Sequence, residues 1–212
     1  MLVTGIKSKP VYAPLQADVR GRYHLMLGLG VGADPLLRVI GELHTTAPHA
    51  MKNTRVLYVP GTRAAGEQIS PACASEVEQF RNEAVADVQG FDSTTALLER
   101  FRTLLQQSLM GTRLYVAGPE SFIGLVMKIA LDFNLNKDEI RAEECGTLAR
   151  RVYCIHCRAT TEDVRTNIVR CVACRRWLLV RDHYSRRLAA YMGVMVDAEA
   201  PGELPPINEV FV

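Results

Sequence analysis

The chain has 212 residues, of which 48% are hydrophobic and 23% are charged. This composition is typical of a globular protein and excludes a wholly disordered chain, because the apolar side chains are numerous enough to form a core. The 25 basic and 23 acidic residues leave a net charge of +2, which argues against a chain dedicated throughout to binding nucleic acid.

Neither a membrane span nor a signal peptide is expected. The first apolar run, residues 25–31, is far shorter than the roughly 20 residues that a membrane-spanning helix needs. Residues 1–15 lack the basic start and long apolar region of a signal peptide. We therefore expect a cytoplasmic protein, in which the six cysteines are metal ligands or buried thiols rather than disulfides.

Strand and helix patterns alternate between residues 22 and 145. Strands are expected at 23–29, 55–59, 85–88, 112–116 and 140–143, and helices at 36–43, 76–84, 94–109 and 121–133. This alternation predicts an α/β fold with an open parallel sheet, a fold that binds ligands at the carboxyl ends of its strands.

Two glycine-containing turns each join a predicted strand to a helix. The first, residues 28–35, reads GLGVGADP, and the second, residues 117–122, reads AGPESF. Glycines let the backbone approach a phosphate closely, and the start of a helix offers free N–H groups to it. The alternative for the first turn is structural, with Asp34 capping the helix and Pro35 as its first residue.

Taken together, the two turns resemble the NAD(P)-binding domain of the ferredoxin reductase superfamily, over about residues 22–143. The resemblance implies an NAD(P) site. Its residues would be Gly30, Gly32, Pro35, Gly118 and Pro119, with Arg63 as either a reader of a ribose 2′-phosphate or a surface arginine.

The sequence departs from that superfamily in three ways. Residues 1–21 are too few for the usual flavin domain, Ala117 stands where a cysteine is usual, and Asp34 replaces a small residue or threonine. A carboxylate at this helix start would occupy the N–H groups that a pyrophosphate needs and would repel it. A working nucleotide site and a scaffold that has lost it both stay open.

Four cysteines form two Cys-x-x-Cys pairs, Cys154 with Cys157 and Cys171 with Cys174. Two such knuckles joined by a short segment offer four thiolates to one ion, which predicts a tetrahedral metal centre. The connecting segment, residues 158–170, is expected to form a hairpin.

Zinc is favoured over iron in this centre. A rubredoxin-type iron site usually has a glycine after each knuckle, whereas Arg158 and Arg175 occupy these positions here. Both metals accept four thiolates, so a redox iron centre stays the alternative. After the knuckles, we expect a strand at 177–180 and a short helix at 185–193.

Charge is distributed unevenly along the chain. Residues 146–187 contain ten arginines, no lysine and three acidic residues, a local net charge of +7, and the residues after 196 contain acids without a basic residue. We expect four parts: an arm (1–21), an α/β domain (22–145), a four-cysteine zinc-ribbon module with a short helix (146–196) and an acidic tail (197–212). The arginines would contact phosphates, an acidic partner or this tail.

The motifs RRVYCIHC, CVAC and LLVRDHYSRRLAAYMGVMVDAEAPGE resemble the C-terminal domain of the DmmA-like subunits of bacterial dimethylamine monooxygenases, also called haem-dependent oxidative N-demethylases. The reductase-like part fits the same family. The resemblance implies a multi-subunit, NADPH-dependent complex that converts dimethylamine to methylamine and formaldehyde, with haem, flavin and an iron–sulfur cluster in partner subunits.

For this chain, that resemblance implies an accessory subunit without catalytic residues of its own. Two alternatives stay open. The chain is an electron-transfer subunit that uses iron or bound NAD(P)H, or a zinc ribbon that binds nucleic acid, which the +7 segment motivates and the acidic tail opposes.

Overall fold

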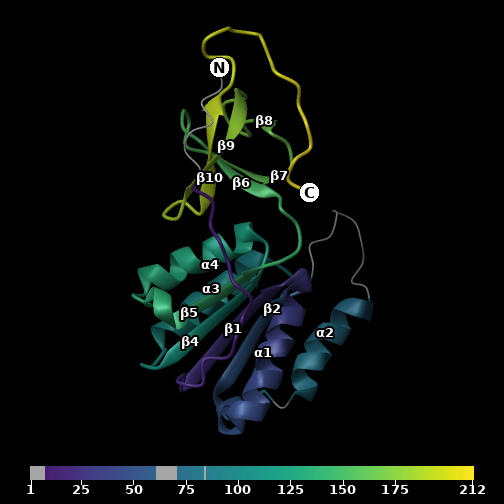
Figure 1. The fold of residues 1–212 in the computed structure, drawn as a ribbon, viewed down its shortest axis with the longest axis vertical. Coiled ribbons are helices and arrows are strands. Elements are labelled where there is room, and N and C mark those ends of the chain that lie inside the picture. The colour runs from purple at the N-terminus through teal and green to yellow at the C-terminus, as the bar shows by residue number, and fades with distance from the viewer. Residues whose placement is uncertain (1–7, 61–70, 84) are drawn as a thin grey trace. The chain divides into compact units, whose positions relative to one another are not determined.

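The computed structural model describes residues 8–60, 71–83 and 85–212. It divides the chain into two compact units (Figure 1). The first unit is Tyr12–Gly146, and the second combines Thr147–Val212 with the described residues 8–11. Among the described residues, no helix has the length and apolar character needed to cross a bilayer.

The first unit is built on a five-stranded, wholly parallel sheet in the order β3-β2-β1-β4-β5. Its strands are β1 (Tyr23–Leu29), β2 (Thr54–Val59), β3 (Asp87–Gly90), β4 (Thr112–Gly118) and β5 (Ile140–Glu144). Its helices are α1 (Ala33–Thr46), α2 (Pro71–Asn82), α3 (Thr94–Gln106) and α4 (Glu120–Asp132). The predicted α/β fold is confirmed, although α2 begins five residues before the sequence pattern indicated.

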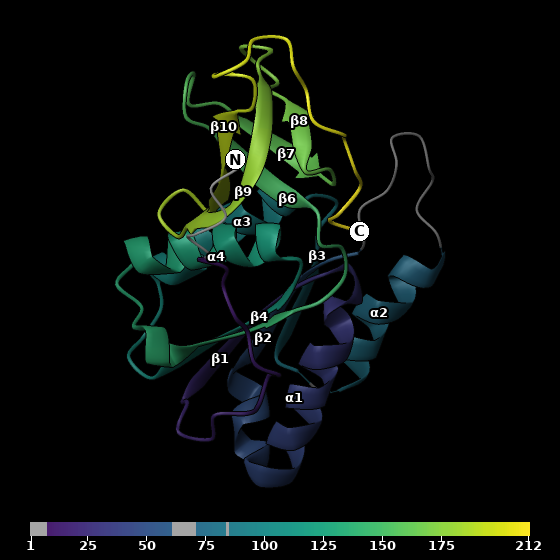
Figure 2. The same cartoon turned by 45° about the horizontal axis from the view of Figure 1, so that its top comes forward.

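Both faces of this sheet are covered, which explains why its central strands are apolar without interruption. Leu25 and Leu27 belong to a core cluster with α3 and α4, whereas Met26 belongs to a second cluster with α1. Figure 2 shows the helix pairs on opposite sides of the strands. Since the strand order reverses between β1 and β4, the carboxyl ends of these two strands form the position where such sheets hold ligands.

The residues immediately before β1 are part of the first unit. Leu15 is buried among the residues of the α1 cluster, and its N–H donates to the carboxylate of Glu143 at 2.6 Å. Asp18 is also buried, and its carboxylate forms ion pairs with Arg20 (2.9 Å), Arg113 (3.0 Å) and Arg141 (3.4 Å). These contacts attach residues 12–21 firmly to the sheet.

The second unit is a five-stranded mixed sheet in the order β7-β6-β10-β9-β8. Its strands are β6 (Arg150–Cys154), β7 (Thr160–Val164), β8 (Ile168–Arg170), β9 (Trp177–Ser185) and β10 (Ala190–Met195). The predicted hairpin between the knuckles is wrong. β7 pairs with β6 and β8 pairs with β9, so these two strands occupy opposite edges of the sheet.

The predicted helix at 185–193 is also wrong, because β9 and β10 form an antiparallel pair there. Tyr184 faces Tyr191 across the pair, with ring centroids 5.1 Å apart. The turn between the strands ends at Ala189, whose φ of 49° lies in the left-handed region that a continuing helix cannot contain. Pairing across the turn outweighs the local helix signal.

A buried arginine fastens the C-terminal segment to the second unit. The guanidinium carbon of Arg150 lies 3.9 Å from the ring centroid of Tyr191 and 3.8 Å from that of Phe211. Its Nη2 forms an ion pair with Asp182 at 2.7 Å. A cation between two aromatic faces is stabilised by both rings, so Phe211 anchors the tail that the sequence pattern described only as acidic.

Gly32→Ala should destabilise the first unit. An added Cβ would lie 2.2 Å from the carbonyl oxygen of Ala117, and overpacking of this kind costs about 1–3 kcal/mol. The matched control is Gly41→Ala in α1, where no atom lies within 4 Å and the gain in helix propensity is about 0.5–1 kcal/mol. Urea unfolding should move the midpoints in opposite directions, and equal midpoints would contradict the packing described.

Asp18→Asn should make the stability of the first unit less dependent on pH in acid. The hydrogen bonds from Arg20, together with Arg113, hold the pKa of the Asp18 carboxyl well below its usual range. The folded state therefore gains stability above the unfolded pKa of about 3.9 and loses it as the pH falls below that value. Chemical unfolding between pH 2.5 and 7 measures the free energy of unfolding of the wild type and of Asp18→Asn. Parallel pH curves for the two proteins would contradict this role of Asp18.

Candidate metal centre

Four sulfur atoms gather at one place in the second unit. The Sγ atoms of Cys154, Cys157, Cys171 and Cys174 all lie within 4.8 Å of one another. Cys154 and Cys174 are 3.8 Å apart, and Cys157 and Cys171 are 3.5 Å apart. A tetrahedron with metal–sulfur bonds of about 2.3 Å has edges of about 3.8 Å, whereas a disulfide brings sulfurs to about 2.05 Å. The donor set therefore fits one tetrahedral ion.

Each knuckle is a tight turn that its own backbone closes. The N–H of Arg158 donates to the carbonyl of Cys154 at 2.9 Å, and the N–H of Arg175 donates to that of Cys171 at 3.2 Å. These arginines have φ values of 65° and 61°, the left-handed region that favours glycine. This left-handed backbone explains why rubredoxin-type sites usually have a glycine after each knuckle. This chain has an arginine at both positions.

Backbone N–H groups also point at the sulfurs. The N–H of Arg176 lowers the pKa of the Cys174 thiol to about 6, and the N–H of Ala159 lowers the pKa of Cys157. Burial raises the pKa of Cys154 to about 11. The thiols of Cys157 and Cys174 thus favour the thiolate form that a metal ion requires, while the buried thiol of Cys154 depends on the ion itself to lose its proton.

The first glycine turn lies at the carboxyl end of β1, but it is packed against its own unit. Gly32 and Pro35 are buried, Gly30 is half-buried with a φ of 57°, and the hydroxyl of Tyr58 donates to the carbonyl of Gly30. Helix α1 begins at Ala33 with Gly32 at its N-cap, so the expectation that Asp34 is the cap is wrong. Asp34 instead lies exposed in the first turn of the helix.

The second glycine turn is packed against residues 145–146. Gly118 and Pro119 are buried, and the N–H of Cys145 donates to the carbonyl of Gly118 at 3.0 Å. A Cβ placed on Gly146 would lie 3.4 Å from Val31 and 3.6 Å from Pro119. Residues 145–146 therefore lie against both turns at the reversal of the strand order. We call this region, residues 30–35 with 118–119 and 145–146, the crest of the sheet.

Carboxylates surround the crest. Burial, and after it the nearby carboxylates of Glu143, Asp34 and Glu144, raise the pKa of the Cys145 thiol to about 11. The carboxyl of Glu120, in the first turn of α4, is buried and accepts a hydrogen bond from the hydroxyl of Tyr12 at 3.4 Å. Arg38 pairs with Glu143, so the negative charge that opposes a bound pyrophosphate comes mainly from Asp34 and Glu144.

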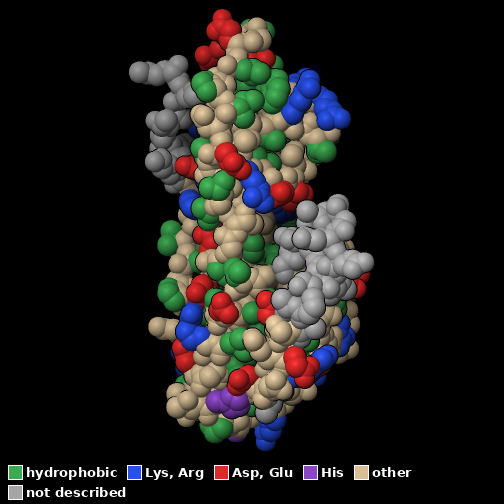
Figure 3. Space-filling model, turned by 90° about the vertical axis from the view of Figure 1, so that its right-hand side faces the viewer, with side chains coloured by type: hydrophobic (Ala, Val, Ile, Leu, Met, Phe, Trp, Pro, Cys, Tyr) green, Lys and Arg blue, Asp and Glu red, His purple; other side chains and the backbone are tan. Residues whose placement is uncertain are grey.

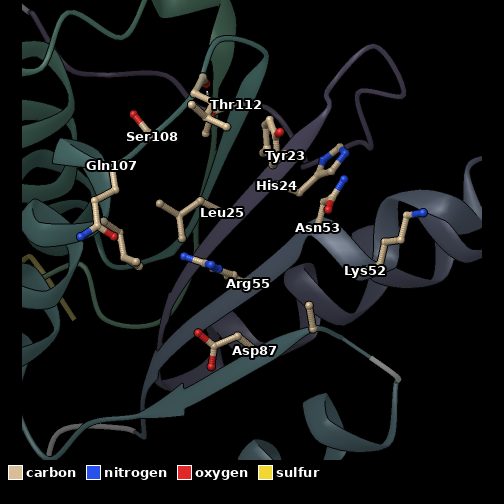
Figure 4. Close-up of a pocket in the computed structure, with 13 residues that line it drawn as sticks. Tyr23, His24, Leu25, Lys52, Asn53, Arg55, Asp87, Gln107, Ser108 and Thr112 are labelled. Atoms are coloured by element: carbon tan, nitrogen blue, oxygen red, sulfur yellow. Dashed lines mark hydrogen bonds between the residues drawn. The ribbon is translucent and has the colours of Figure 1, made fainter.

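Arg63, the expected reader of a 2′-phosphate, lies outside the described residues. An open groove of about 260 Å³ lies elsewhere in the first unit, at the amino ends of β1 to β3 and the end of α3. Figure 4 shows Arg55 and Asp87 projecting into it from neighbouring strands, with Gln107 opposite. Arg55 and Gln107 are exposed to water, so the groove would desolvate little of a ligand, and we assign no site to it.

Models of one protein family match most of the chain. The N-terminal domain of the dimethylamine monooxygenase subunit DmmA-like family matches residues 4–140, and its C-terminal domain matches residues 151–194. The chain belongs to the DmmA-like family. The family expected from the knuckle motifs is thereby confirmed.

A curated relative of this DmmA-like chain is the heme-dependent oxidative N-demethylase delta subunit of Ectopseudomonas mendocina (strain ymp). It is 31% identical over 140 residues, which cover 66% of this chain and 79% of the relative. The name of this relative describes it as one subunit of a larger enzyme.

Solved structures resemble the chain only distantly. The ferredoxin reductase of carbazole 1,9a-dioxygenase has a TM-score of 0.40 at 15% identity, over 63% of this chain and 34% of its own. The Amycolatopsis cytochrome P450 reductase GcoB has a TM-score of 0.42 at 16% identity, over 60% of this chain and 38% of its own. The chain spans little more than a third of these proteins, and its fold class rests on its own strand order.

Cys171→Ser should release the metal and unfold the second unit. Cys171 is fully buried within the sulfur cluster, and metal binding in such modules is folding free energy, about 10–16 kcal/mol in zinc-finger peptides. Metal per chain and hydrogen exchange of residues 150–195 measure the effect. Cys145→Ser, the same change outside the cluster, is the control and should keep the metal. Full metal content in Cys171→Ser would rule out the four-thiolate centre.

Proposed function

We propose that this chain is an accessory subunit of a multi-subunit, haem-dependent oxidative N-demethylase that acts on dimethylamine with NADPH as its reductant. Haem, flavin and an iron–sulfur cluster reside in the partner subunits, and this chain binds those subunits. Family membership and the delta-subunit relative support this proposal. Because the thiolate centre requires reduced cysteines, the proposed location is the cytoplasm.

The observation that carries the accessory role is the closed crest. In a nucleotide-binding sheet of this topology, the reversal of strand order leaves a crevice for the pyrophosphate. Here Gly32 packs on Ala117, residues 145–146 lie on both turns, and carboxylates surround Cys145. A dinucleotide would have to displace the chain's own backbone and neutralise that charge.

In this proposal the second unit holds structural zinc at Cys154, Cys157, Cys171 and Cys174. Zinc has no redox chemistry, and a closed site of four cysteines leaves no position for a substrate. Its contribution is to hold both knuckles together.

One observation favours a second candidate, an electron-transfer subunit. The N–H groups that point at Cys157 and Cys174 are of the kind that tune the reduction potential of iron–sulfur centres. If iron occupied the four thiolates, this chain would lie in the electron path.

Metal analysis and a visible spectrum of the chain, purified without added metal, separate the two candidates. The accessory role predicts one zinc per chain and no visible absorption. One iron per chain, with thiolate-to-iron charge-transfer bands that reductant bleaches, would replace it with the electron-transfer role.

Nucleotide binding is tested on the same protein. Titration with NADPH to about 1 mM should leave the nicotinamide fluorescence unchanged, because the crest excludes the pyrophosphate. Asp34→Thr removes one carboxylate without opening the crest, so it should restore no binding. Saturable binding to the wild type would contradict the closed crest.

A further inference from the structure

The two knuckles present apolar side chains at their tips. Ile155 and Val172 each follow the first cysteine of a knuckle, and they are 43% and 57% exposed. Their backbones are held from within the unit, since the N–H of Ile155 donates to Gly193 and that of Val172 donates to Thr161. The backbone that carries these two branched, partly exposed apolar side chains is thus held in place beside the sulfur cluster.

Arginines surround these tips without carboxylate partners. The three acids of residues 146–187 are each paired elsewhere: Glu162 with Arg151, Asp163 with Arg165 and Asp182 with Arg150. Arg158, Arg175 and Arg176 are exposed, and within the described ranges none of them forms an ion pair with a carboxylate. Figure 3 shows a group of basic side chains on the second unit that stands apart from its acidic ones.

The thiolate–metal centre balances only part of this charge. Four thiolates and a divalent ion carry −2, while the exposed arginines at the tips, with Arg170 held over the ring of Trp177, carry more positive charge than that. Arg176 does hydrogen-bond to Cys174, which assigns one cation to the centre. Arg158 and Arg175 lie at the turn positions, where the left-handed backbone fixes the direction in which each side chain leaves the chain.

We propose that Ile155, Val172, Arg158, Arg175 and Arg176 form a docking surface, the knuckle surface, for an acidic segment of a partner subunit that places apolar side chains between its carboxylates. An apolar centre with a charged rim is the usual anatomy of a protein interface, and arginine is enriched there. The inference rests on the proposed function, because it requires a partner subunit.

Two other occupants fit less well. The chain's own acidic tail begins directly after β10, where the N–H of Val196 donates to the carbonyl of Trp177. The carboxylate of Asp197 is already used within the tail, because it accepts a hydrogen bond from the N–H of Gly202. A nucleic acid would use the arginines but would gain nothing from two exposed aliphatic side chains, which single-strand binders replace with aromatic rings.

The experiment uses the tagged full-length chain, purified from its own cells after nuclease treatment, with haem per tagged chain as the readout. Ile155→Ser combined with Val172→Ser should lower the retained haem about tenfold, since loss of two central contacts weakens an interface by at least that factor. Arg158→Glu combined with Arg175→Glu should do the same and should also weaken the dependence of binding on salt.

The matched control is Arg186→Glu combined with Arg187→Glu, the same charge change at the exposed β9–β10 turn. It should retain haem as the wild type does, and all variants should hold wild-type amounts of metal. A single Arg158→Gln provides a milder variant that keeps the fold. If the tagged wild-type chain is purified without haem, the proposed function and this inference are overturned together.

Two outcomes would overturn the inference alone. In the first, wild type retains haem and so do both knuckle variants. In the second, the knuckle variants lose nucleic acid from samples not treated with nuclease and keep all of their haem, which would assign the surface to nucleic acid.

Discussion

The start of helix α1 lies so close to the end of β4 that a residue with a side chain does not fit there. Gly32 rests on the carbonyl of Ala117, and a side chain there would overlap it. In sheets of this strand order, the same place opens into a crevice that receives a ligand. Here the crest continues into residues 145–146, which lie on both turns. The parallel sheet therefore keeps its folding role, with both faces buried, while its ligand position is filled by the chain itself.

The second unit differs from the first in having only a small apolar core. The buried cluster consists of seven residues, and two of them, Cys154 and Cys171, belong to the sulfur centre. Small domains of this kind depend on metals or disulfides because burial alone stabilises them too little. The centre fixes one end of the sheet, and Arg150 between Tyr191 and Phe211 fixes the C-terminal segment. A metal and a buried cation thus provide stability that a larger apolar core would otherwise supply.

Two patterns that are local in the sequence predicted the structure correctly. The strand at 23–29 and the knuckles at Cys154 and Cys171 depend on spacing over a few residues, and the structure contains both. The helix expected at 185–193 failed because β9 and β10 pair across the turn. The contact of Arg150 with Phe211 joins residues far apart in the chain, so no local signal could reveal it.

The positions of the glycines were predictable, but their role was not. A glycine that approaches a phosphate and a glycine that approaches a carbonyl look alike in a sequence, since both need the missing Cβ. The distinction comes from Ala117, which lies on another strand and meets Gly32 only in the folded sheet. Asp34 was the sequence signal of a charge that repels a nucleotide, and the structure adds Glu143 and Glu144 near Cys145, the thiol that Asp34 also affects.

The small net charge of +2 conceals a separation of charge that matters for binding. Carboxylates gather at the crest of the first unit, and arginines without carboxylate partners gather at the knuckle surface of the second. At physiological ionic strength a charge is screened beyond about 8 Å, so a partner responds to the patch it touches rather than to the whole chain. Composition therefore excludes a general polyanion binder without excluding a local one. Because the arginines accompany two apolar tips, an acidic protein segment matches this surface better than a uniformly charged polymer does.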